Sequence, residues 1–223
     1  MCFSTEASFI AGATLTTVGV VAMKKAEPRS YLPFAAIPFL FAIQQFSEGV
    51  EWLAFNGKVD EEWLTPAKYV FLLFAQVIWP AWVPFAVFKS EKNTTRIKFL
   101  VPFLIAGIGL AIYHLYCLAT YNVTAEVGEH HILYRLEYLR SGKTITNIIY
   151  FATAVIPPFL SSNNRMRLVG LANLISLLAT FIFYREYLLS VWCYFAALIS
   201  VCVLWAIYPR SEKQNMLRAD SLN

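Results

Sequence analysis

The stretch QQFSEGVEW, residues 44–52, places two glutamines and two glutamates inside an otherwise apolar run. Gln44, Glu48 and Glu51 are spaced so that they stack on one face of a helix. An ionised carboxylate near the centre of a bilayer costs roughly 2.5–3.5 kcal/mol on insertion scales. A membrane helix with two such groups is therefore expected to turn them toward other polar groups inside a bundle, where they can bind a proton, a metal ion or a polar ligand.

The most specific chemistry open to these acids is a metal site. Glu48, Glu51 and His114 supply two carboxylates and an imidazole, a set that zinc or another divalent metal accepts, and Cys2 adds a thiolate. Three protein ligands and a water would give a Lewis acid and an activated hydroxide. The alternative is that the acids hydrogen-bond to hydroxyls and to each other, as structural contacts or as a proton-linked site.

The composition indicates that these residues sit in a membrane protein. Of 223 residues, 58% are hydrophobic and 14% are charged, whereas soluble domains carry about 25% charged residues. The apolar runs predict an all-α fold, a single domain over residues 1–223 with seven transmembrane helices. Their expected ranges are 8–23, 31–56, 64–88, 97–121, 143–160, 168–184 and 187–208.

The loop charges predict the orientation of this bundle. The loops after the first, third and fifth predicted helices, with the C-terminal tail, hold 12 basic and 4 acidic residues. The other side holds 6 basic and 10 acidic residues. The positive-inside rule then places the C-terminus in the cytoplasm and the N-terminus outside the cell membrane.

With this orientation, most polar residues of the predicted helices fall in the outer half of the membrane. They predict a ligand pocket that opens outward and is closed toward the cytoplasm. The residues expected to line it are Gln44, Gln45, Glu48, Glu51, Trp52, Asn147, Tyr150, Asn173, Ser176, Thr180 and Ser190.

The long outer loop, residues 122–142, is expected to carry a short amphipathic helix. Ile132, Leu133, Leu136 and Leu139 share one face at helical spacing, and Gly142 ends the pattern. Such a helix can be a plain interfacial connector or a lid over the pocket.

Several classes of function are excluded by the sequence. No lysine lies in the middle of the last helix to anchor retinal, and no nucleotide-binding motif is present. The basic residues lie in short loops, so nucleic acid is not an expected partner. Cys2, Cys117 and Cys193 are all expected on the outer side, where Cys2 pairs with one of the others or all three remain free thiols.

Two segments carry a resemblance. MCFSTEASF at the start and PFAAIPFLFAIQQFSEGVEW in the second helix resemble motif segments of an uncharacterised bacterial seven-helix membrane family. The resemblance implies no activity, but it adds weight to the nearness of Cys2 and Glu48. The motif positions it singles out are Cys2, Phe3, Ser4, Gln44, Gln45, Glu48 and Trp52.

A weaker resemblance concerns topology alone. Seven helices with the N-terminus outside are similar to the alkaline ceramidase and adiponectin receptor superfamily of zinc-dependent membrane hydrolases. The chain departs from that pattern because no histidine follows His131, so a three-histidine zinc site is excluded.

The sequence therefore predicts a multi-pass membrane protein whose outward polar pocket binds a metal ion or a small polar ligand. The alternatives are a metal-dependent hydrolase of a lipid amide or ester, a small proton-coupled transporter or channel in which Glu48 titrates, and a passive assembly subunit. The expected partners are the lipid bilayer, an unidentified small ligand and, in a homo-oligomer, further copies of the chain.

Overall fold

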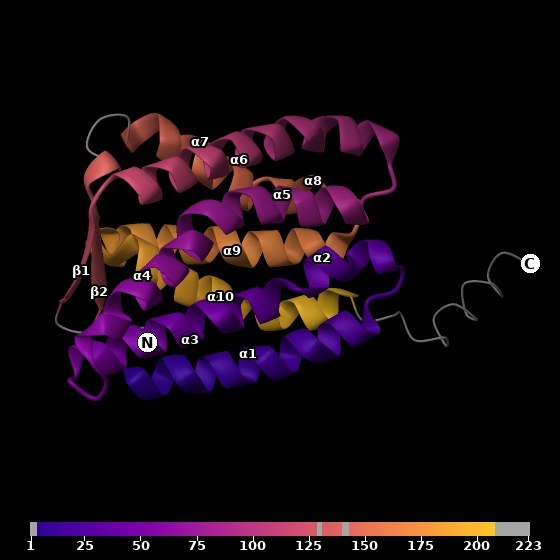
Figure 1. Ribbon diagram of the computed structural model, residues 1–223. Helices are drawn as coiled ribbons and strands as arrows, with labels where there is room; N and C mark the ends of the chain where they lie inside the picture. Colours follow the sequence, from indigo (N-terminus) through magenta and orange to yellow (C-terminus); the bar gives the residue numbers. More distant parts are fainter. Residues whose placement is uncertain (1–3, 129–130, 140–142, 208–223) are drawn as a thin grey trace, which may run out of the picture.

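The computed structural model describes residues 4–128, 131–139 and 143–207. The described chain is mostly helical, and its long helices run side by side with a β-hairpin across one end (Figure 1). The helices are α1 (Thr5–Lys25), α2 (Leu32–Ala35), α3 (Ile37–Phe55), α4 (Leu64–Leu72), α5 (Trp79–Ser90), α6 (Thr94–Thr120), α7 (Lys143–Val155), α8 (Pro157–Leu160), α9 (Asn164–Phe183) and α10 (Leu188–Ile207). Short 3-10 turns cover Arg29–Tyr31, Glu61–Trp63, Glu137–Leu139 and Arg185–Tyr187, and a π-helical segment covers Leu73–Ile78.

Five helical stretches are long and apolar enough to cross a membrane, as judged by length and composition. They are Thr5–Lys25, Glu61–Ser90, Thr94–Thr120, Asn164–Phe183 and Arg185–Ile207. Each coincides with one predicted span. Helix α3 is not among them, because its glutamines and glutamates lower its hydropathy, and α7 has only 13 residues.

Two predicted spans are interrupted at prolines. The expected helix 31–56 breaks at Ala36, shortly before Pro38, and the expected helix 143–160 breaks at Ile156, before Pro157. Pro38 and Pro157 have no N–H to donate to the residues four positions before them, Phe34 and Thr153, so the helical hydrogen-bond ladder is interrupted and each run divides into two helices.

The prediction of an amphipathic helix in residues 122–142 is wrong. This loop forms an antiparallel hairpin of β1 (Val123–Val127) and β2 (Ile132–Leu136), with Val123 opposite Leu136. In β2 the buried residues alternate with more exposed ones, and Ile132, Tyr134 and Leu136 face the bundle. Ile132 and Leu136 lie four apart, which fits one face of a helix and one face of a strand equally well, so the spacing alone did not separate the two.

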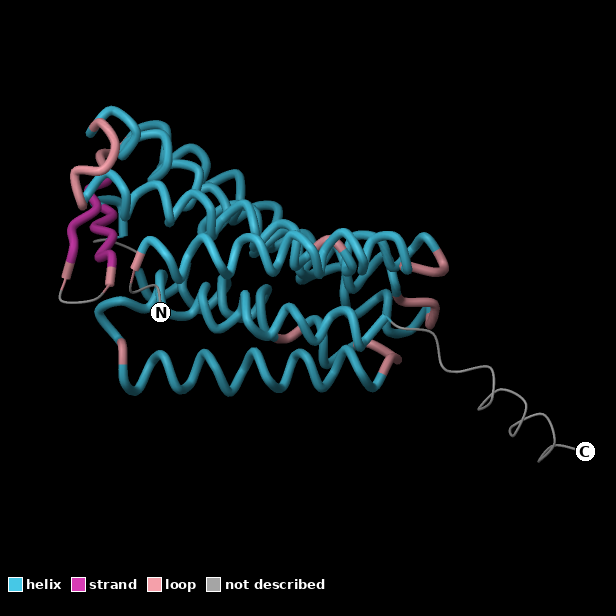
Figure 2. Tube along the Cα trace, turned by 90° about the horizontal axis from the view of Figure 1, so that it is seen from below, coloured by secondary structure: helices cyan, strands magenta, loops and turns pink. Residues whose placement is uncertain are grey.

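The hairpin is held against the bundle by the neighbouring helices. The Nζ of Lys68 in α4 donates to the carbonyl oxygen of Val123 at 2.7 Å, and the ring of Tyr134 stacks on Phe71 at 4.7 Å between centroids. Helix α3 runs toward this end (Figure 1), and Figure 2 shows from a second direction that the two strands lie across one end of the helices. The acids near the end of α3 therefore lie in the half of the bundle that the hairpin covers.

Candidate functional site

The polar residues of α3 are completely enclosed by the bundle. Gln44, Gln45, Glu48 and Glu51 all have a relative exposure of 0%. The Nε2 of Gln45 donates to Oε2 of Glu48 at 3.2 Å, which joins neighbouring turns of the same helix. Buried ionisable groups are costly, so their presence points to a function and to compensating contacts from other elements.

Those contacts come from two elements far away in the sequence. The hydroxyl of Ser190, in the first turn of α10, donates to Oε1 of Glu48 at 2.8 Å. The hydroxyl of Tyr134, in β2, donates to Oε1 of Glu51 at 3.0 Å. The second oxygen of Glu51 is buried and has no hydrogen-bond partner within the described part of the chain. The hairpin and α10 therefore hold the two carboxyl groups in place.

Gln44 lies on the same face of α3, nearer its N-terminus than the two glutamates. The indole Nε1 of Trp79 donates to Oε1 of Gln44 at 2.7 Å, and the Trp79 ring stacks on Phe41 with centroids 3.9 Å apart. This contact places α3 directly beside the junction between the π-helical segment and α5.

That junction frees two backbone carbonyl groups inside the bundle. The N–H of Trp79 donates to Phe74, in the wider π-helical pattern. The next residue, Pro80, has no N–H, and it occupies the position that would serve Gln76 in an α-helix or Ala75 in a π-helix. Both carbonyl oxygens must therefore find donors elsewhere.

Two side chains from other helices supply these donors. The hydroxyl of Tyr150, in α7, lies 2.5 Å from the carbonyl oxygen of Ala75. The Nδ1 of His114, in α6, lies 2.9 Å from the carbonyl oxygen of Gln76. A carbonyl only accepts, so the His114 hydrogen sits on Nδ1 and Nε2 is left as an acceptor. The broken helix is thus tied to α6 and α7 by polar contacts.

This arrangement does not support the predicted metal site. Among the residues that the structure describes, no group of three histidine, cysteine, aspartate or glutamate side chains lies close enough to hold a metal ion. His114 contacts the α4–α5 junction, while Glu48 and Glu51 are bound by Ser190 and Tyr134. Cys2, the fourth predicted ligand, lies outside the described residues.

The thiols in the described region are free. Cys117 and Cys193 are buried and unpaired with each other, and Cys202 is exposed. The predicted alternative in which one of them pairs with Cys2 involves a residue that lies outside the description.

A cavity of about 270 Å³ lies between the hairpin, α7 and the start of α10. We call it the hairpin cavity. Of the predicted pocket residues, Asn147, Tyr150 and Ser190 line it. Ser190 and Tyr134 line it as well as binding Glu48 and Glu51, so the buried acids lie one hydrogen bond behind its wall.

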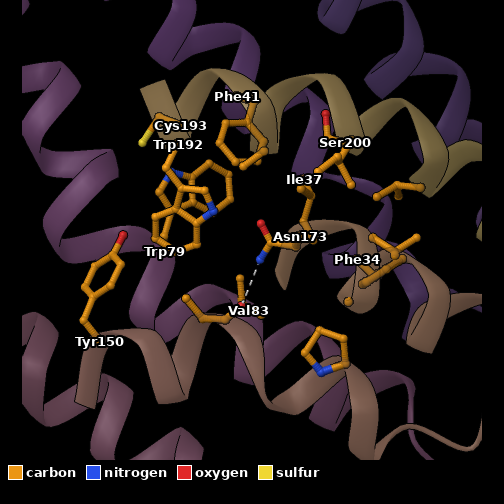
Figure 3. A pocket seen from close by; sticks show the side chains of 17 residues that line it. Phe34, Ile37, Phe41, Trp79, Val83, Tyr150, Asn173, Trp192, Cys193 and Ser200 are labelled. Atoms are coloured by element: carbon orange, nitrogen blue, oxygen red, sulfur yellow. Dashed lines mark hydrogen bonds between the residues drawn. The ribbon is translucent and has the colours of Figure 1, made fainter. Parts of the chain in front are cut away.

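A second, smaller cavity of about 80 Å³ lies between α3, α5, α9 and α10 and is mostly apolar (Figure 3). Phe34, Phe41, Trp79 and other apolar side chains line it, and Tyr150 and Trp192 line both cavities. Asn173 points into this apolar cavity and donates its Nδ2 to the carbonyl oxygen of Ala154 at 3.5 Å. The lining of this cavity is mostly apolar, whereas several polar groups converge on the hairpin cavity, so the hairpin cavity is the better site for polar chemistry.

Trp52, Ser176 and Thr180, also predicted pocket residues, line neither cavity. The hydroxyls of Ser176 and Thr180 bond back to carbonyls of their own helix, at 2.7 and 2.8 Å. Trp52 is buried in an apolar cluster with Phe71 and Leu72. The two hydroxyls are therefore satisfied within their own helix, as is common for serine and threonine in helices.

Sequence reasoning missed three residues that shape the site. Gln76 and Trp79 belong to the apolar run before Pro80, and a proline in the middle of a predicted span was the available signal of a broken helix. Tyr134 was hidden because residues 122–142 were interpreted as helical, although the alternation of Ile132, Tyr134 and Leu136 fits a strand.

A buried tyrosine that follows the hairpin, Tyr138, packs against α6. The ring of Tyr138 lies 6.1 Å from the ring of His114, between centroids, and its hydroxyl has no hydrogen-bond partner in the described chain. Burial raises the pKa of Tyr138 above its ordinary value, and the nearby thiol of Cys117 raises it further. The Tyr138 phenol is therefore neutral and packs as an uncharged group beside His114.

Comparisons with known proteins assign the chain to one protein family. No curated protein and no solved structure matches the chain. A family of unknown function, DUF6629, matches residues 1–219, nearly the whole sequence. The chain therefore belongs to the DUF6629 family.

Proposed function

We propose that this protein is a multi-pass membrane protein that binds a small polar ligand in the hairpin cavity. The observation that carries the proposal is the position of Ser190, whose side chain lines the cavity and donates to the fully buried Glu48 at 2.8 Å. A ligand in the cavity would therefore meet a wall polarised by a carboxyl group. Concave sites with a few convergent polar groups are where small ligands bind.

The proposed topology has seven spans, with the N-terminus outside. It adds α3 and the α7–α8 pair to the five apolar spans, and the excess of basic residues in the loops opposite the hairpin favours an outer location for the hairpin. A cysteine placed at exposed Lys58 should react with an impermeant maleimide in intact cells, whereas one at exposed Lys92 should react only after lysis. The opposite pattern would overturn this orientation.

Ligand binding is tested by thermal stability in nanodiscs. A panel of small amines, alcohols, carboxylates and amino acids is added, because a ligand that binds the native state raises the unfolding temperature. Ser190→Ala should abolish the ligand-induced rise. Ser200→Ala, a buried serine on the same helix that lines only the apolar cavity, should keep it. No stabilisation by any panel member, or equal responses in the two variants, would reject the proposal.

Proton-coupled transport is a second candidate, favoured by the broken α4–α5 helix beside the acids. Interrupted helices with freed carbonyls recur at the substrate sites of transporters. The Trp79–Gln44 bond places such an interruption next to the α3 face that carries Glu48. Liposomes containing a pH-sensitive dye should show proton flux that collapses in Glu48→Gln. Equal flux in the variant and in the wild type would exclude this mechanism.

A further inference from the structure

The walls of the hairpin cavity offer hydrogen-bond acceptors at three hydroxyl positions. Ser190 donates its single hydrogen to Glu48, Tyr134 donates to Glu51, and Tyr150 donates to the carbonyl of Ala75. A hydroxyl has one hydrogen, so none of the three has a donor left for a ligand. At these three positions the wall therefore presents acceptors, which favour a ligand that places N–H or O–H donors there.

The charged residues around the cavity also indicate the chemistry of its ligand. Glu186 lines it directly, and Glu48 and Glu51 stand one hydrogen bond behind it. Arg185 is the one basic residue among the described lining residues; it is exposed, with its guanidinium 5.4 Å from the centroid of the Phe181 ring. Glu186 is therefore the carboxylate in the cavity wall, and the Arg185 guanidinium is engaged by the Phe181 ring, so Glu186 favours a cation as the ligand.

Aromatic rings complete the enclosure. Tyr150 and Phe151 each meet Trp192 edge to face, with centroids 5.9 and 5.6 Å apart, and Phe181 and Tyr187 form further parts of the wall. The faces of such rings attract ammonium groups, Trp most strongly. The volume of about 270 Å³ corresponds to roughly nine waters at about 30 Å³ each, which suits a small organic molecule.

We propose that the ligand of the hairpin cavity is a small organic ammonium ion that carries N–H donors. This rests on the proposed function, because it names the chemistry of the ligand bound at that same site. Ser190, Tyr134 and Tyr150 accept hydrogen bonds from the ammonium group, the faces of the aromatic rings contact it, and Glu186 supplies the opposing charge.

The test compares three probes of similar size in nanodiscs of phosphatidylglycerol, which contain no amine lipid. Ethanolamine carries the ammonium, propan-1-ol replaces it with a methyl group, and glycolate carries a negative charge. Calorimetric titration should give ethanolamine an affinity at least tenfold above that of propan-1-ol and show no binding of glycolate. Equal or tighter binding of propan-1-ol or glycolate would overturn the ammonium assignment while leaving ligand binding at this cavity intact.

Substitutions in and away from the hairpin cavity test whether ethanolamine binds there. Glu48→Gln and Glu186→Gln should each weaken ethanolamine binding at least fivefold, and Ser200→Ala should leave it unchanged. Glu186 is exposed, so its variant keeps the test valid if Glu48→Gln does not fold. Equal affinity in the Glu186→Gln variant and the wild type would also contradict the assignment. If no member of the broad ligand panel binds, the proposed function itself fails.

The same chemistry can come from a free amine or from a lipid headgroup. Repeating the titration in nanodiscs that contain phosphatidylethanolamine separates the two. A lower apparent affinity for free ethanolamine means that the headgroup competes for the cavity, and an unchanged affinity means that the site takes the soluble amine. Both results support an ammonium ligand, and loss of the preference for ethanolamine over propan-1-ol in either membrane would contradict it.

Discussion

The imidazole Nδ1 of His114 lies 2.9 Å from the carbonyl oxygen of Gln76, and Pro80, four residues beyond Gln76, cannot serve that carbonyl. The imidazole thus stands in for a missing backbone N–H. Tyr150 does the same for Ala75 one residue earlier. The interruption of the α4–α5 helix is therefore stabilised from outside, by α6 and α7, and these helices depend on it in turn.

Replacing His114 with phenylalanine should destabilise the protein by about 1–3 kcal/mol, because the Gln76 carbonyl stays buried without a donor. The cost should shrink by about 1 kcal/mol in a Pro80→Ala background, where an N–H is restored close to the freed carbonyls. Thermal unfolding in detergent, followed by the reaction of the buried Cys117 and Cys193 with a thiol dye, measures both effects. Additive losses in the double variant would refute this coupling.

Replacing Tyr134 with phenylalanine should also destabilise the protein by about 1–3 kcal/mol, because it removes the hydrogen bond to Glu51 and leaves that carboxyl group without its donor. The phenylalanine keeps the stacking on Phe71, so packing is preserved. Tyr116→Phe, on an exposed face of α6, is the matched control and should change the unfolding temperature little. Equal stability of the two variants would show that the Tyr134 hydroxyl does not hold Glu51.

Gly107 is expected to tolerate no side chain. A Cβ at this position would lie 2.1 Å from the carbonyl oxygen of Pro80, a backbone atom that cannot move aside freely. Gly107→Ala should therefore push α6 away from α5 and lower the unfolding temperature by several degrees. Gly109→Ala meets no atom within 4 Å and should be neutral or stabilising by up to about 1 kcal/mol, since alanine favours the helix. Similar behaviour of the two variants would contradict the close approach.

Acid should weaken the loop contact made by Glu91. Burial pushes the pKa of Glu91 upward, but hydrogen bonds from the backbone of Asn93, Ser162 and Lys92 and from the Ser162 hydroxyl outweigh burial, so its pKa lies below the ordinary value of 4.5. A lowered native pKa gives stability that is complete above the unfolded value and is lost as the pH falls through the native value.

The measurement for Glu91 is the unfolding temperature between pH 3 and pH 7. The wild type should lose stability below about pH 4.5 more steeply than Glu91→Gln, which has no proton to gain there. The exposed Glu62→Gln variant should follow the wild-type curve. Parallel curves for the wild type and Glu91→Gln would mean that the Ser162 contact does not depend on the charge.

The sequence predicted the long apolar helices closely, because a run of about 20 apolar residues has few other uses. Helices α1 and α6 begin and end within three residues of their expected bounds. The stripe of polar residues on α3 was also visible, since a period of 3.6 places Gln44, Glu48 and Glu51 together. Their partners were not visible, because Ser190 and Tyr134 lie 142 and 83 residues farther along the chain.

The interpretations that failed share a physical cause. His114 was grouped with the acids because all three residue types bind metals, whereas the structure uses its imidazole to serve the Gln76 carbonyl. A proline removes one backbone donor, and the side chain that replaces it can come from any neighbouring helix. The hairpin was missed because Ile132 and Leu136 satisfy two periods at once. The position of Tyr134 between them, stacked on Phe71 and bonded to Glu51, identifies the strand.

The bond between Ser190 and Glu48 also sets an order of events during synthesis. The two residues are 142 positions apart, which is roughly 7–28 s of translation at about 5–20 residues per second. For that interval the nascent α3 has no α10 to shield its acids. Ribosome-bound chains that stop before α10 should therefore be held at the insertion machinery and be cleared by proteases once released, and equal lifetimes of truncated and full-length chains would speak against this dependence.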